Sequence, residues 1–238
     1  MNTFKKIVLR AKNFLFPENC ALCESALIEG DEIRLGLCRD CVLAINSVPA
    51  DNGKCLICGK PLISEAETCL SCRNSRYSYD RLWTLFPYTG KYRKLLTAYK
   101  FEKKLSVADF FAEKIAEIIK NEPPLENVVI VPVPPRPGKI KETGWDQVDY
   151  LVRRLKKYSP EASVSRLLKR GKSKVQKQLN RSQRLGNLKG RIKTIGNVPN
   201  TVLVIDDVIT TGSTMEVCSN VLKESGARIV YGICLFYD

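Results

Sequence analysis

Hydrophobic and polar positions follow two different patterns along this 238-residue chain, and the change falls near residue 77. From there to the C-terminus, apolar runs of strand length alternate with segments whose apolar residues recur every three or four positions. Strands are expected at 81–88, 126–138, 162–168, 201–206 and 228–236, and helices at 91–101, 106–120, 145–158 and 213–224. Because strands that alternate with helices favour a parallel sheet, residues 77–238 are expected to form an α/β domain.

Residues 1–16 have helical spacing of their own, with Phe4, Ile7, Val8, Ala11, Phe14 and Leu15 on one face. Basic residues interrupt this apolar face, so the segment lacks the unbroken core of a secretory signal. No run in the chain approaches the ~20 apolar residues of a transmembrane helix. We expect an amphipathic helix that packs on the chain's own core, with membrane-surface binding as the alternative. The protein is expected to be cytoplasmic.

Cysteines dominate the region before residue 77, where eight of the ten form four C-x-x-C pairs: Cys20/Cys23, Cys38/Cys41, Cys55/Cys58 and Cys69/Cys72. A C-x-x-C turn directs two thiolates to one point, and two turns complete the tetrahedral sulfur shell that zinc prefers. In a cytoplasmic chain these pairs indicate metal sites rather than disulfides. We expect two structural zinc ions with no catalytic role, and an iron–sulfur cluster is the alternative. Cys218 and Cys234 are expected to be buried core thiols.

The order of the pairs leaves two arrangements open. In the simpler one, the first two pairs hold one ion and the last two pairs hold the other. In a cross-braced arrangement, the first pair would join the third and the second would join the fourth. Either arrangement places two zinc sites within residues 17–76, between the helix at 1–16 and the α/β domain at 77–238.

The net charge of +14 is concentrated in one part of the chain. Residues 136–193 hold eighteen basic and four acidic residues, and no acid lies between Glu161 and Asp206. Such a long run is expected to attract phosphate groups, in small molecules or in nucleic acid, with a solubilising surface as the alternative. The chain has no histidine, which excludes histidine from every metal, acid–base and pH-sensing role.

The segment 202–214, VLVIDDVITTGST, places two carboxylates after a hydrophobic strand and before the start of a helix. Ligands of parallel sheets bind at the carboxyl ends of strands, and the free N–H groups of a helix start attract anions. A phosphate in the turn and sugar hydroxyls on the carboxylates would together hold a sugar phosphate such as ribose 5-phosphate. The residues concerned are Asp206, Asp207, Thr210, Thr211, Gly212, Ser213 and Thr214.

Three other interpretations fit parts of this segment. Two acids after an apolar strand also occur in Walker B elements, but residues 170–174 (RGKSK) supply only the end of a P-loop, and Arg166 stands where its first glycine is needed. A phospho-acceptor aspartate would leave the hydroxylated turn unexplained. The structural alternative is a capped turn with solvated acids.

The segment 202–214 resembles the phosphoribosyl-pyrophosphate (PRPP) motif of type I phosphoribosyltransferases, and residues 17–238 as a whole resemble the ComF/GntX family. This resemblance implies a type I phosphoribosyltransferase-like, mostly parallel sheet with helices on both faces, preceded by a small zinc-ribbon domain, a double zinc ribbon at residues 17–76. It implies binding of PRPP or ribose 5-phosphate with Mg2+, with Asp206 and Asp207 on the ribose and residues 210–214 on the 5′-phosphate. It also implies a role in competence, DNA uptake or DNA utilisation.

Residues 131–147 resemble the family's pyrophosphate-loop region, and the candidate contacts there are Pro134, Arg136, Lys139 and Lys141. Gly144 and Gln147 match the family pattern, whereas Thr143, Trp145 and Asp146 replace its Arg, Phe and Asn. Residues 169–190 resemble a flexible segment of the family through Gln176, Leu179, Arg184 and Asn187, while Ile192 replaces its Phe. The resemblance implies Asp206, Asp207 and Arg136 as catalytic residues of a phosphoribosyltransferase whose acceptor the sequence does not identify.

An adaptor without catalysis is the alternative from a different functional class. Its zinc ribbons and the basic residues 166–193 would bind single-stranded DNA, a competence helicase or another DNA-processing protein, with Trp145, Tyr150 and Tyr158 available to stack on bases. A PRPP sensor without turnover is a third hypothesis.

Overall fold

The computed structural model describes residues 18–46, 53–62, 64–73, 76–122, 125, 127–171 and 190–238. The helix predicted at 1–16 lies outside the described residues, as do Gln176, Leu179, Arg184 and Asn187 of the basic segment. The chain divides into two compact units, Met1–Pro49 with Thr89–Phe111 and Ala50–Tyr88 with Ala112–Asp238. The boundary between ribbon and α/β domain at residue 76 stays a prediction.

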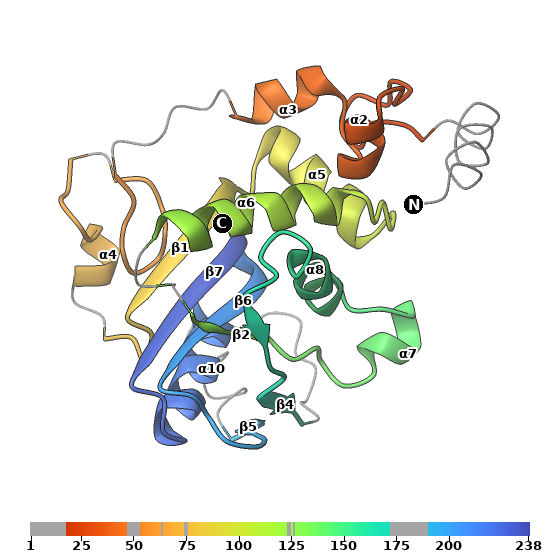
Figure 1. Ribbon diagram of the computed structural model, residues 1–238. Helices are drawn as coiled ribbons and strands as arrows, with labels where there is room; N and C mark the ends of the chain where they lie inside the picture. Colours follow the sequence, from red (N-terminus) through yellow and green to blue (C-terminus); the bar gives the residue numbers. More distant parts are fainter. Residues whose placement is uncertain are drawn as a thin grey trace. The chain divides into compact units, whose positions relative to one another are not determined.

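The sheet of the second unit has five parallel strands in the order β1-β7-β6-β2-β3 (Figure 1). The strands are β1 (Arg81–Pro87), β2 (Val129–Pro132), β3 (Ser163–Val164), β6 (Thr201–Ile209) and β7 (Ile229–Tyr237). Val204 of β6 pairs with Val131 of β2 on one side and with Gly232 of β7 on the other. Long apolar runs suit such central strands because both of their faces are buried. The predicted parallel sheet is confirmed.

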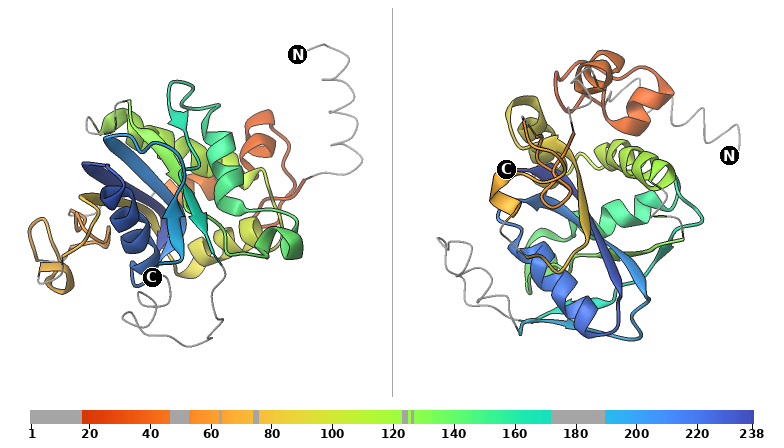
Figure 2. Two further views of the ribbon diagram at one scale, coloured as in Figure 1. Left: turned by 90° about the horizontal axis from the view of Figure 1, so that it is seen from below. Right: turned by 90° about the vertical axis from the view of Figure 1, so that its left-hand side faces the viewer.

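Helices cover both faces of this sheet, as predicted. Helix α8 (Gln147–Leu155) follows β2, helix α10 (Ser213–Glu224) follows β6, and the two lie on opposite sides of the sheet (Figure 2). Leu151 and Leu155 of α8 and Leu222 of α10 are fully buried. The chain therefore leaves the neighbouring strands β2 and β6 toward opposite faces. Parallel sheets bind ligands at the carboxyl ends of strands around such a switch point.

The element boundaries differ from the prediction in several places, and the strand expected at 126–138 is limited to β2 at Val129–Pro132. Strand β6 continues to Ile209, so Asp206 and Asp207 lie within it and not at its end. The strand expected at 162–168 is divided into β3 and β4 (Leu168–Arg170), and β4 pairs antiparallel with β5 (Ile192–Thr194), which was not predicted. A short helix, α7 (Lys139–Thr143), follows the proline-rich end of β2. Short polar strands and single-turn helices carry too little periodicity to be recognised in a sequence.

The first unit contains α2 (Gly30–Leu35), α3 (Arg39–Asn46), α5 (Gly90–Lys100) and the start of α6 (Val107–Asn121). Helix α5 holds the N-terminal cysteine region through backbone carbonyls: Lys94 Nζ donates to Leu22 O at 2.6 Å, and the Tyr92 hydroxyl donates to Ile45 O at 3.3 Å. Within the described ranges, no helix has both the length and the apolar character needed to cross a membrane.

Candidate functional site

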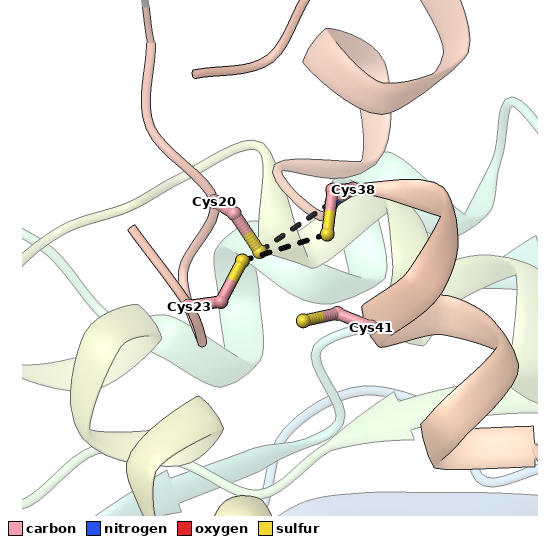
Figure 3. A group of neighbouring side chains, drawn as sticks. All are labelled: Cys20, Cys23, Cys38 and Cys41. Atoms are coloured by element: carbon pink, nitrogen blue, oxygen red, sulfur yellow. Dashed lines mark hydrogen bonds between the residues drawn. The ribbon is translucent and has the colours of Figure 1, made fainter. Parts of the chain in front are cut away.

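The eight paired cysteines form two separate groups of four. Cys20, Cys23, Cys38 and Cys41 make one group, and Cys55, Cys58, Cys69 and Cys72 make the other, with all sulfurs of a group within 4.8 Å of one another. Figure 3 shows the first group, in which two side chains from a turn face two from the start of α3. The sequential pairing is therefore correct and the cross-braced one is excluded.

Both groups fit a zinc ion on the chemistry of their thiols. The side chain and backbone of Ser25 lower the pKa of Cys23 to about 6. Burial raises the pKa of Cys55, but backbone amides at Cys69, Cys58 and Ile57 outweigh it and bring the pKa to about 7. Burial and neighbouring sulfurs raise the pKa of Cys41 and Cys58. Each group thus contains one cysteine whose lowered pKa favours the thiolate. A bound zinc ion would displace the protons of the remaining thiols, and the four sulfurs would form a closed S4 shell around it.

The two ribbons share one backbone plan. In each, the amide of the first cysteine donates across its turn, from Cys20 to Ser25 O at 2.8 Å and from Cys55 to Lys60 O at 2.9 Å. Four residues after that cysteine the backbone is left-handed, at Glu24 (φ 66°) and Gly59 (φ 69°). Two residues before the third cysteine it is left-handed again, at Gly36 (φ 66°) and Glu67 (φ 60°).

Glycine occupies the left-handed position at which each ribbon packs on another element. A Cβ atom on Gly36 would lie 2.4 Å from Ser106 Oγ, and one on Gly59 would lie 2.5 Å from Thr84 Cγ2 on β1. The Thr84 hydroxyl donates to Gly59 O at 2.6 Å, and the amide of Leu82 donates to Leu56 O at 2.8 Å. The second ribbon is therefore attached to the edge strand of the parallel sheet through its first turn.

A short connector, Tyr77–Tyr79, joins this second ribbon to β1 and supports the start of α10. The amide and hydroxyl of Ser78 donate to the Glu216 carboxylate at 2.8 and 2.7 Å, in the first turn of that helix. A Cβ atom on Gly212 would lie 3.6 Å from the Tyr79 hydroxyl. The Tyr77 hydroxyl is 3.8 Å from Cys72 Sγ. One zinc site and the helix start after β6 are thus linked by three consecutive residues.

The turn after β6 has the features of an anion site. Gly212 has a left-handed backbone (φ 74°) and immediately precedes α10, a 12-residue helix. The hydroxyls of Thr211 and Ser213 lie 2.8 Å apart, while Thr210 is exposed and Thr214 half-buried. The first N–H groups of a helix have no partner within the helix and carry its positive dipole end. Residues 210–214 therefore form a compact turn of the kind that accepts a phosphate.

The two aspartates have different surroundings. Alternation along β6 directs their side chains to opposite faces of the sheet. Asp207 is buried, and its Oδ2 accepts a hydrogen bond from Gln147 Nε2 at 2.5 Å, at the start of α8. Asp206 is half-buried, and its Oδ1 accepts the amide of Asp207 at 2.8 Å. The two carboxylates consequently lie on opposite faces of β6, three and two residues before its end at Ile209.

The predicted pyrophosphate-loop residues are brought to the same end of the sheet by β2, and two of the four, Arg136 and Lys139, are already paired. Lys139 Nζ donates to Asp146 Oδ2 at 2.6 Å and also to Gln147 Oε1. Arg136 is exposed and donates from Nη1 to Glu142 Oε1 at 2.8 Å; this hydrogen bond lowers the pKa of the Glu142 carboxyl. Lys141 is exposed and Pro134 is buried.

Two contributors to this region were not predicted as site residues. The sequence marks Gln147 only as a match to the family pattern, and its contact with Asp207 spans 60 positions in sequence. Arg170 of β4 was one of eighteen basic residues in its stretch, and nothing in the sequence distinguishes it. Cys218 and Cys234 are buried, as predicted, and burial raises the pKa of both thiols.

Comparison with known proteins gives relatives along most of the chain. Residues 11–73 match the double zinc ribbon domain family. The competence protein ComFC of Streptococcus pneumoniae is 29% identical over 82% of this chain and 84% of its own length. Competence protein F of Haemophilus influenzae is 26% identical over 81% and 86% of the two chains. The DNA utilization protein YhgH of Escherichia coli is 25% identical over 92% and 96%.

Among solved structures, the adenine phosphoribosyltransferase of Leishmania tarentolae overlaps 59% of this chain and 75% of its own, at 13% identity and a TM-score of 0.37. That score is too low to support a conclusion, so the α/β assignment rests on the strand order and the helices described above. The zinc-ribbon match and the competence and DNA-utilization relatives agree with the resemblance found in the sequence. The chain is thus similar to the ComF-type competence and DNA-utilization proteins along most of its length, and its N-terminal part matches the double zinc ribbon family.

Proposed function

We propose that the protein binds PRPP or ribose 5-phosphate with Mg2+ at the carboxyl ends of β6 and β2, and that it transfers the phosphoribosyl group to an acceptor. One observation carries the proposal. Two carboxylates lie on β6, and a helix start rich in hydroxyl groups follows that strand, at the switch point of a parallel sheet. Asp206 and Asp207 would accept the ribose hydroxyls, and residues 210–214 would hold the 5′-phosphate.

Transfer from PRPP breaks the bond between ribose C1 and the pyrophosphate oxygen. Positive charge develops on the sugar ring while the leaving group takes the bonding electrons. The protein's contribution is to fix the ribose and to stabilise the departing anion with preorganised cations. Bound Mg2+ would neutralise part of the pyrophosphate charge. Arg136, Lys139 and Lys141 are candidate donors from the chain, and the first two would exchange their present carboxylate partners for the ligand.

Calorimetric titration with PRPP and Mg2+ tests the binding, and pyrophosphate release over a panel of nucleobases tests the transfer. We expect saturable PRPP binding, and release with one class of base. Binding without release from any acceptor would favour the sensor over the enzyme. Absence of PRPP binding by zinc-loaded, folded protein would contradict the proposal.

Single-stranded DNA binding is the second candidate, and the β4–β5 hairpin favours it. Lys169 and Lys193, both exposed, are direct cross-strand partners. Like charges opposite one another destabilise a hairpin, and a bound polyanion would remove that cost. The names of the relatives, competence and DNA utilization proteins, agree with such a ligand.

Fluorescence anisotropy with an oligothymidylate over a range of salt concentrations checks the DNA candidate. The logarithm of the affinity should fall linearly with the logarithm of the salt concentration. The Lys169→Gln/Lys193→Gln variant should reduce that slope by about 1.4, since each phosphate contact on a single strand contributes about 0.7. Affinity that does not depend on salt, or no binding at low salt, would exclude the candidate.

A further inference from the structure

Arg170, at the end of β4, forms no ion pair with any of the described residues, and Asp206 is the acidic residue that acts on its charge from a distance. Its side chain is half-buried, and its Nε is fully enclosed with no hydrogen-bond partner among the described residues. Enclosing a guanidinium N–H without an acceptor is unfavourable, and folded proteins seldom leave such a group unsatisfied. The position therefore calls for an acceptor that comes from outside the described chain.

The surroundings of Arg170 indicate that this acceptor is an anion. Burial lowers its pKa, Cys218 and Asp206 oppose that effect, and Arg136 adds to it. The charge of Arg170 is thus opposed by that of a second arginine and favoured by one aspartate. The segment that follows Arg170 cannot supply a counterion from its side chains, because residues 162–205 contain no acid. Two arginines near one carboxylate are stable together when a further anion lies between them.

The two arginines differ in how ready they are for a ligand. Arg136 is exposed and held by Glu142, with a hydrogen bond of 2.8 Å and a second, shorter one. Arg170 is held in place by the pairing of β4 with β5, in which it lies opposite the fully buried Ile192, and its guanidinium would have to break no ion pair with a described residue. A preorganised donor gives up less conformational freedom on binding than an exposed, paired one.

We infer that Arg170 binds the pyrophosphate group of the phosphoribosyl donor, beside the ribose-binding carboxylate Asp206. The inference rests on the proposed function and adds to it a residue that discriminates between PRPP and ribose 5-phosphate. The 5′-phosphate already has the turn 210–214 and the start of α10 to hold it. The group that remains for a further cation is the pyrophosphate on C1, which ribose 5-phosphate lacks.

Binding of two ligands by a set of variants tests this assignment. Arg170→Gln should weaken PRPP binding in the presence of Mg2+ by ~10- to 100-fold, the effect expected for losing hydrogen bonds to a charged group. Binding of ribose 5-phosphate should change by less than about 3-fold, a small fraction of that effect. Arg153→Gln on α8, which removes an exposed arginine outside the site, should change neither affinity. Arg136→Gln should weaken PRPP binding less than Arg170→Gln does.

Thermal unfolding without ligand separates a binding role from a structural one. Removing an unpaired, enclosed charge should leave the melting temperature of Arg170→Gln unchanged or raise it. If Arg170→Gln has a lower melting temperature than the wild type, PRPP binding by the Arg170→Lys variant is measured instead. Selective loss of PRPP binding by folded Arg170→Lys protein supports the inference, and unchanged PRPP binding overturns it. An equal loss of affinity for PRPP and for ribose 5-phosphate, or no loss for either, would also overturn the inference, while the proposed function would stand. If the wild-type protein binds neither ligand, the proposed function fails and the inference fails with it.

Discussion

Substitution of Cys58 with serine is expected to abolish the cooperative unfolding of the second unit and to remove one of two zinc ions. The second ribbon is attached to β1 through Gly59 and Leu56, so its loss exposes the edge of the parallel sheet. Structural zinc contributes about 10–16 kcal/mol to the folding of small zinc peptides, as much as the whole stability of a typical domain. Zinc content and calorimetric unfolding measure both effects.

Cys41→Ser is the matched control, since it removes one ligand from the first zinc site. The contacts of that ribbon described above lie with α5 and Ser106, within the first unit. We expect this variant to lose one zinc ion as well but to keep PRPP affinity within about 3-fold, because it touches none of the site's hydrogen bonds. Equal loss of PRPP binding by Cys41→Ser and Cys58→Ser would contradict the separate roles of the two ribbons.

Replacement of both Asp206 and Asp207 with alanine is expected to reduce PRPP affinity by at least ~100-fold. Each carboxylate would accept a sugar hydroxyl, and a hydrogen bond to a charged group contributes ~1.5–3 kcal/mol, so two contribute ~3–6 kcal/mol. Because Asp207 also accepts the Gln147 side chain, its loss leaves a buried amide without that partner. Calorimetric titration of the folded variant with PRPP and Mg2+ measures the loss.

Single variants separate the two carboxylates. Asp206→Asn keeps the contact between Gln147 and Asp207, so its effect should be confined to ligand binding. Asp207→Asn should also lower the melting temperature, since it weakens a buried hydrogen bond. Asp149→Asn on α8, whose carboxylate pairs with Arg153 and Arg166, should leave PRPP binding unchanged. Full PRPP affinity in the double alanine variant would remove the two aspartates from the site.

Local patterns were sufficient to predict most of the elements and the zinc ligands. Helix α10 begins and ends where the apolar spacing and Gly226 predicted it, at residues 213–224. The order of the cysteines left two groupings open, and the simpler, sequential one is the one that the structure has. These features depend on neighbours within a few residues, and such neighbours are visible in a sequence.

The remaining features depend on contacts between distant segments. Strands β4 and β5 are three residues each and pair across about twenty residues of basic sequence, so neither has a recognisable period. Arg170 is distinguished from its basic neighbours only by its burial and by the electrostatic influence of Asp206 and Cys218 on its guanidinium. Both of those residues lie on other elements. The shared backbone plan of the two ribbons is not visible in the sequence, because glycine occupies a different left-handed position in each. The close approach of Ser106 requires glycine at Gly36, and that of Thr84 requires glycine at Gly59.

The most direct test of the phosphoribosyl site is a crystal structure of the zinc-loaded protein with PRPP and Mg2+. The account predicts the ribose against Asp206 and Asp207, the 5′-phosphate within hydrogen-bond distance of the amides of residues 210–214, and the pyrophosphate against the Arg170 guanidinium. Density for the ligand at any other place on the protein, with the carboxyl ends of β6 and β2 empty, would contradict it.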